Sequence, residues 1–116
     1  MPALNFQKQF ADKVRSGEKH QTIRAYRKRP FVEGDKLYLF TCLRNKNCER
    51  LGEATALEVS HVFMQEDGLF ILGSQPLSSV EVDKMARDDG FRSHADMLSY
   101  IKKTYGLPFQ GQLIRW

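Results

Sequence analysis

The sequence predicts a single α+β domain over residues 1–116, built as a small mixed or antiparallel β-barrel with about three flanking helices. The chain has 116 residues, a length that suits one domain. Short β-like segments are numerous, and such strands tend to close on themselves because closure removes exposed edges. Three stretches with helical periodicity lie among them, so helices are expected to pack on one side of the barrel or to cover an end.

The N-terminal part is predicted to form a strand, a helix and a second strand. Alternation of apolar and polar residues indicates a short strand at 4–6. Apolar side chains then recur every four residues, which predicts an amphipathic helix over about 7–16, ended by Gly17 as its C-cap. A strand is expected at 20–24.

The middle of the chain is predicted to be mainly β. Residues 25–30 form a basic loop that ends at Pro30. The clearest strand is 37–43, where aromatic and aliphatic residues with high β-propensity follow one another. Further β-structure is expected in three places: a polar hairpin tip at 44–47, one long β-like segment at 52–64 and a short strand at 69–72.

Two helices and a closing strand are predicted for the rest. Ser78 and Glu81 form a capping-box pattern at the start of the first helix. Ser93 is the expected cap of the second, which should end at Gly106. The chain then closes with a strand at 113–116.

Composition narrows the classes of function. No apolar run approaches the roughly 20 residues of a membrane span. The N-terminus lacks a basic region followed by an apolar one, so a cytoplasmic protein without a signal peptide is expected. Cys42 and Cys48 are interpreted as reduced thiols. With no further ligands at zinc spacing, neither a metal nor a cofactor is expected.

The positive charge is concentrated in the first half of the chain. Residues 1–50 hold 12 Lys and Arg against 5 Asp and Glu, whereas residues 51–116 hold 6 against 9. Such an asymmetry favours a surface that meets a phosphate backbone or another anion. A solvated basic surface that aids solubility would give the same count.

The segment 17–24 concentrates groups with possible chemical roles. In an extended strand Thr22 and Arg24 point to one face and Ile23 to the other. Lys19 lies three residues before Thr22, so it can join that face only if it is still in the turn and curls back. The segment therefore predicts an ammonium, a hydroxyl and a guanidinium around one concave spot.

Together these features resemble the ASCH domain family over nearly the whole chain. The pattern Gly17-x-Lys19-x-x-Thr22-Ile23-Arg24 is its most specific part, and Gly34-Asp35, Asp89-Gly90-Phe91 and Tyr105-Gly106 follow in the same order. The resemblance implies a PUA-like β-barrel. It also implies a link to RNA, because the family includes RNA-binding modules, ribonucleases and a small bacterial amidohydrolase of N4-acetylcytidine.

The resemblance also assigns candidate roles. The Lys and Thr of that amidohydrolase's catalytic set match Lys19 and Thr22, and its Glu falls at or near Asp89, which is one methylene shorter. In this hypothesis a neutral Lys19 is the base, Thr22 is the activated hydroxyl or positions the water, and Asp89 protonates the leaving amine. The basic loop at 25–30 is interpreted from its own residues, and not from the resemblance, as a phosphate clamp with a base-stacking ring. The predicted ligand-binding residues are Arg24, which would hold an oxyanion or a phosphate, and Tyr26, Arg27, Lys28 and Arg29.

The sequence leaves several functions open. The first is a pocket that binds RNA, tRNA among the candidates, or a modified pyrimidine nucleoside and hydrolyses an amide on it. The alternatives are a metal-independent ribonuclease and a non-catalytic RNA-binding or regulatory module. Each residue also has a structural interpretation: Lys19 and Arg24 as plain phosphate ligands, Thr22 as a strand residue, and Asp89 as a surface partner of Arg87 or Arg92.

Overall fold

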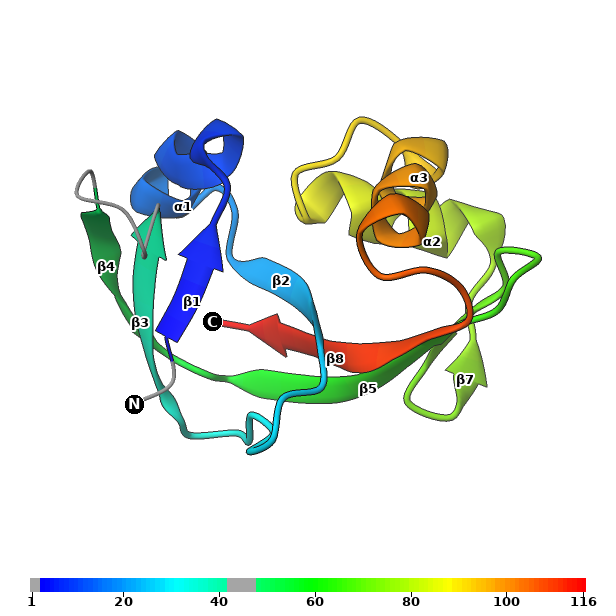
Figure 1. Ribbon diagram of the computed structural model, residues 1–116, viewed down its shortest axis with the longest axis horizontal. Helices are drawn as coiled ribbons and strands as arrows, with labels where there is room; N and C mark the ends of the chain where they lie inside the picture. The colour runs from blue at the N-terminus through cyan, green and yellow to red at the C-terminus, as the bar shows by residue number, and fades with distance from the viewer. Residues whose placement is uncertain (1–2, 42–47) are drawn as a thin grey trace.

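The computed structural model describes residues 3–41 and 48–116 and confirms the α+β class (Figure 1). The predicted hairpin tip at 44–47 and Cys42 lie outside the described residues. The strands are β1 (Ala3–Phe6), β2 (Gln21–Ala25), β3 (Lys36–Thr41), β4 (Glu49–Thr55), β5 (Glu58–Met64), β6 (Phe70–Leu72), β7 (Gln75–Pro76) and β8 (Phe109–Arg115). The helices are the 3₁₀ turn η1 (Lys8–Phe10), α1 (Ala11–Ser16), α2 (Ser79–Asp88) and α3 (His94–Thr104).

The described strands form two sheets, and a closed barrel is not confirmed. One sheet has the order β1-β3-β4 and the other the order β2-β8-β5-β6-β7. Strand β1 runs parallel to β3, and the other described pairs are antiparallel. Strand β8 lies between β2 and β5 and pairs with both of them.

The prediction of one long β-segment at 52–64 is wrong, because the chain changes sheets within it. Strand β4 pairs with β3, whereas β5 pairs with β8. Between them the amide of Ala56 donates to the carbonyl of Asp35, and that of Leu57 donates to the carbonyl of Arg115, both at 2.8 Å. These two bonds direct the chain from one sheet to the other.

The helix signals are largely confirmed. Ser78 and Glu81 make the predicted capping box at α2, and Ser93 caps α3 by accepting from the amide of Asp96. The helix predicted over 7–16 is divided into η1 and α1, and it ends at Gly17 with a left-handed φ of 83°. Among the described helices, none combines the length and apolarity that a membrane crossing needs.

Two apolar clusters make up the core, and β8 contributes to both. Ile114 packs with the cluster around β1, β3 and α1, whereas Leu113 packs with the cluster under α2 and α3. Figure 1 shows α1 near one end of the long β5–β8 ribbon and α2 with α3 near the other, on the same side of it. Strand β2 runs along β8 between these helices and therefore can carry side chains toward both.

The closing strand is longer than predicted and also holds the loop after β2. The buried side chain of Gln112 accepts from the backbone amide of Phe31 at 3.0 Å and donates to the carbonyl of Phe31 at 2.9 Å. The oxygen and the nitrogen of the Gln112 side-chain amide therefore both have a hydrogen-bond partner, as buried polar groups require. This contact holds the loop after β2 on β8.

Candidate functional site

The candidate site is a small pocket between the N-terminal elements and the α2–α3 side of the molecule. Its cavity volume is about 60 Å³, enough for a few water-sized groups. The lining brings together four of the predicted residues with a set of aromatic rings. The lining residues are Asn5, Phe6, Gln7, Phe10, Lys19, Thr22, Ile23, Arg24, Asp89, Phe91, Tyr100 and Tyr105.

Lys19 reaches the pocket from the turn before β2, as the argument from the sequence required. Its backbone amide donates to the carbonyl of Lys13 at 2.9 Å, which folds the turn back onto the end of α1. The side chain is only 3% exposed. Its Nζ donates to the backbone carbonyl of Asp89 and lies 3.4 Å from Asp89 Oδ2. The ammonium therefore bridges two parts of the chain that are 70 residues apart.

Asp89 takes its position from the C-terminal end of α2. It is the C-cap of that helix, and its amide donates to the carbonyl of Met85 at 2.9 Å. Gly90 follows with φ of +100°, and a Cβ there would lie 3.0 Å from the Phe10 ring. Glycine thus provides both the left-handed turn and the close approach of Phe10. The surface pairing of Asp89 with Arg87 or Arg92 does not occur, since Arg87 pairs with Asp83 and Asp89 with Lys19.

Burial sets the electrostatics of the Lys19–Asp89 pair. Loss of solvent raises the pKa of Asp89 to about 6, and the positive charge of Lys19 only partly opposes this. Loss of solvent likewise lowers the pKa of Lys19, against the opposing pull of Asp89. Both shifts favour a neutral amine beside a carboxylic acid, because desolvation penalises the charged form of each group. Burial therefore brings the pKa values of Lys19 and Asp89 closer together.

Asp89→Asn is expected to change how stability depends on pH. The pKa of Asp89 is raised from 3.8 to about 6, so the folded state binds this proton more tightly than the unfolded chain. Stability contributed by protonated Asp89 is therefore lost as the pH rises through 6, by about 2 kcal/mol between pH 4 and pH 6. Urea unfolding at pH 4 and pH 6 should show this extra loss in the wild type only. An equal pH dependence in both proteins contradicts the shift.

Gln21 is a site residue that reasoning from the sequence missed. It is 1% exposed, and its Nε2 donates to the carbonyl of Met85 at 3.3 Å and approaches Asp89 Oδ1 at 3.5 Å. Its Oε1 accepts from Arg115 Nε at 3.4 Å. Gln21 thus orients the Asp89 carboxylate. A strand residue with a polar, β-neutral side chain carries no sequence signal for this role.

Thr22 and Arg24 share a face of β2, as predicted. Arg24 Nε donates to Thr22 Oγ1 at 3.0 Å, and another guanidinium nitrogen donates to the carbonyl of Asn5 at 2.7 Å. The guanidinium also lies 4.9 Å from the centre of the Phe6 ring. Thr22 accepts a hydrogen bond from a cation in this arrangement, so its own hydroxyl hydrogen can be donated to a ligand.

Aromatic rings form the walls of the pocket. Tyr105 is 43% exposed and lines the pocket. Phe91 packs against both core clusters and lines the pocket as well. Trp116 is packed against the core and lies edge-on to Phe6, with 5.8 Å between the ring centres. Tyr105 is the C-cap of α3, directly after the last helical residue, Thr104.

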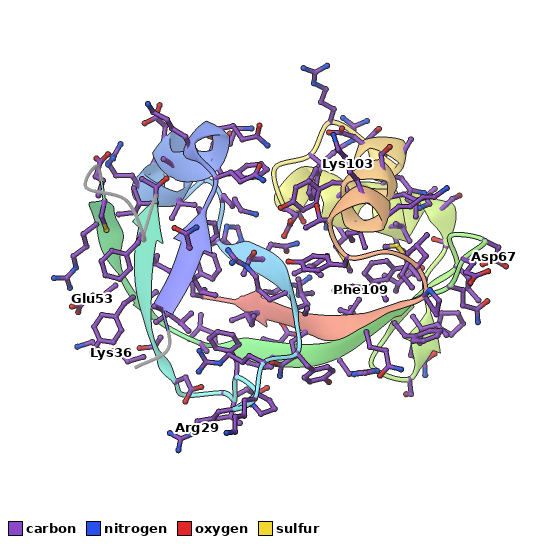
Figure 2. The ribbon with its side chains drawn as sticks, viewed as in Figure 1. Arg29, Lys36, Glu53, Asp67, Lys103 and Phe109 are labelled. Carbon is purple, nitrogen blue, oxygen red and sulfur yellow. The ribbon has the colours of Figure 1, made fainter. Side chains whose placement is uncertain are left out.

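The structure does not bring the basic loop into this pocket. Arg27, Lys28 and Arg29 are absent from its lining. In Figure 2 the labelled Arg29 lies on the side of β5 and β8 opposite the three α-helices. Tyr26 hydrogen-bonds through its hydroxyl to His61 Nδ1 at 2.5 Å and stacks on that ring. The predicted residues thus divide into a buried pocket group and a separate exposed loop.

Metal ligands are not gathered at the site. In the part of the chain that the structure describes, no three His, Cys, Asp or Glu side chains come close enough to hold a metal ion. Cys48 is an exposed free thiol. The pocket lining carries an ammonium, a carboxyl, a hydroxyl and a guanidinium, together with the phenol groups of Tyr100 and Tyr105.

Comparisons with known proteins leave the function to be argued from this geometry. No family model matches the chain, and neither a curated protein nor a solved structure matches it significantly.

Proposed function

We propose that the chain is a PUA-like, ASCH-type hydrolase that cleaves the amide of an N-acylated pyrimidine nucleoside, with N4-acetylcytidine as the model substrate. The observation that carries the proposal is the buried Lys19–Asp89 pair beside Thr22 and Arg24. A buried ion pair is a weak source of stability. A perturbed acid and base in a pocket are, in contrast, typical of catalytic sites.

In the proposed mechanism the neutral form of the pair supplies both a base and an acid. Water adds to the amide carbonyl carbon and gives a proton to Lys19 Nζ. The C–N bond then breaks as Asp89 gives its proton to the leaving amine nitrogen. The proton on Lys19 returns to the Asp89 carboxylate, which restores the starting pair, and the acid product loses its proton to solvent. Asp89 has one methylene less than the Glu implied by the resemblance, and here direct contact with Lys19 lets the proton return.

Arg24 and Thr22 are proposed to stabilise the oxyanion that forms on the carbonyl oxygen. Arg24 uses N–H groups on Thr22 and Asn5, which leaves other guanidinium hydrogens for a ligand. The aromatic walls of the pocket suit a flat base. Donors that are already held in position when the charge develops stabilise it more strongly than water does.

Incubation with N4-acetylcytidine, followed by mass spectrometry, tests the proposal. We expect stoichiometric release of cytidine and acetate. N4-methylcytidine, which lacks the carbonyl, is the control and should remain unchanged. A tRNA pool is tested in parallel, because cleaved strands would support the ribonuclease alternative. Unchanged N4-acetylcytidine would contradict the hydrolase proposal.

A non-catalytic RNA-binding function is the second candidate, and the exposed basic loop favours it. Lys28 and Arg29 are exposed, and Tyr26 presents a ring that is 42% exposed next to them. A cationic loop with an aromatic ring suits single-stranded RNA. This candidate predicts salt-sensitive RNA binding that falls when Lys28 and Arg29 are replaced by Ala, with no turnover of N4-acetylcytidine.

A further inference from the structure

A larger groove adjoins the pocket and shares two of its walls. It is lined by Gln9, Phe10, Lys13, Gly90, Phe91, Arg92 and Asp96, and its volume is about 380 Å³. Phe10 and Phe91 line both spaces, and their rings contact each other edge-on with centres 5.9 Å apart. The pocket and the groove therefore lie next to each other, and this pair of rings belongs to the walls of both.

The groove has one free cation on each side. Lys13 comes from α1, and Arg92 comes from the turn between α2 and α3. Arginines nearby in the sequence are paired, Arg15 with Asp12 and Arg87 with Asp83. Within the described residues, neither Lys13 nor Arg92 has an ion-pair partner. Both cations are exposed and available to an anion.

Asp96 is the one acid among the described residues that line the groove, and its carboxylate already accepts a hydrogen bond. Its Oδ2 accepts from the backbone amide of Arg92 at 3.1 Å, in the first turn of α3. An acid at this position is stabilised by the positive end of the helix. The groove therefore keeps an excess of one positive charge, and Gln9 adds a neutral side-chain amide that can donate.

We propose that this groove binds the phosphate of a nucleotide whose base occupies the adjoining pocket, with Lys13 and Arg92 on opposite sides of the phosphate. The inference rests on the proposed nucleoside pocket. It implies that the preferred ligand is a nucleoside phosphate or a nucleotide within an RNA strand, and not the free nucleoside. Guanidinium and ammonium groups are the usual side-chain partners of phosphate.

The test compares equilibrium binding of cytidine, its 3′- and 5′-monophosphates and a short oligocytidine by calorimetry at two salt concentrations. The wild type should bind a phosphorylated ligand about tenfold or more tightly than cytidine, as expected for charge-assisted bonds. The Lys13→Ala/Arg92→Ala variant should lose most of that preference. If only the oligomer shows the preference, the phosphate belongs to an RNA strand, and if a mononucleotide does, a free nucleotide suffices.

A matched control removes two positive charges at the other end of α3. Lys102→Ala/Lys103→Ala should keep the preference for the phosphorylated ligand, because both residues lie in the last turn of α3. Lys103 is labelled in Figure 2. An equal loss in the control, equal affinities for cytidine and its phosphates, or no binding of any ligand overturns the inference. Binding without turnover of N4-acetylcytidine overturns the hydrolase proposal alone, and turnover without a phosphate preference overturns the groove alone.

Discussion

Lys19→Met is expected to abolish turnover of N4-acetylcytidine and to lower the free energy of unfolding by about 3–5 kcal/mol at pH 7.5. The stability loss follows because Asp89, 5% exposed, would keep a negative charge with its nearest cation removed. The cost should shrink at pH 5, where Asp89 is protonated, since burial already raises its pKa to about 6. Urea unfolding and product release measured on the same samples give both readouts.

Two further variants separate catalysis from stability in this experiment. Lys8→Met makes the same substitution at an exposed lysine and should change stability by no more than about 0.5 kcal/mol. Lys19→Met/Asp89→Asn removes the unpaired charge, so stability should largely return while turnover stays absent. Retained turnover in Lys19→Met, or a stability loss that the double variant does not reduce, would contradict the assigned role of the pair.

Gly111→Ala should be the most destabilising single-methyl addition in β8. A Cβ at this position would lie 2.2 Å from the carbonyl oxygen of Arg24 and 2.6 Å from Cζ of Phe109. The first neighbour is backbone, so the clash can be relieved only by moving β2 away from β8. Overpacking usually costs about 1–3 kcal/mol of stability, and a clash that moves the backbone costs more. We therefore expect the free energy of unfolding, measured in urea, to fall by at least about 3 kcal/mol.

The same displacement should damage the pocket, because Gly111 pairs with Ala25 at the end of the strand that carries Thr22 and Arg24. Protein that still folds should therefore bind cytidine or its phosphates more weakly than the wild type. Gln110→Ala, at the exposed neighbouring position of β8, is the control and should be nearly neutral. A loss below about 1 kcal/mol for Gly111→Ala would show that β2 and β8 separate easily.

Several elements could be predicted because their signals are local. The capping box from Ser78 to Glu81 needs only residues within one helical turn, and it is present at α2. Gly17 ends α1 because it can adopt a left-handed φ of 83°. Thr22 and Arg24 share a face because side chains alternate along any strand. The first 3₁₀ turn, by contrast, has the same apolar spacing as an α-helix, so the spacing could not identify it.

The site itself could be predicted only in part. Lys19, Thr22 and Arg24 are near neighbours in the chain, so the sequence placed them together and the structure agrees. Gln21 and Tyr105 were missed, because each depends on a contact with a distant segment: Gln21 with α2, and Tyr105 with the pocket mouth. The basic loop was expected beside Arg24, but the chain leaves the pocket after β2 and takes Arg29 to the other side of the sheet (Figure 2).

The sequence by itself determined the α+β class, the positions of the helix caps and the strand that presents a hydroxyl and a guanidinium on one face. Only the tertiary structure decided that 52–64 is divided between two sheets, into which the described strands are arranged. It also decided that Asp89 meets Lys19 across 70 residues, away from solvent. The reason is physical: caps and alternation depend on bonds within a few residues, whereas a pKa set by burial depends on which distant segments exclude water from the same place.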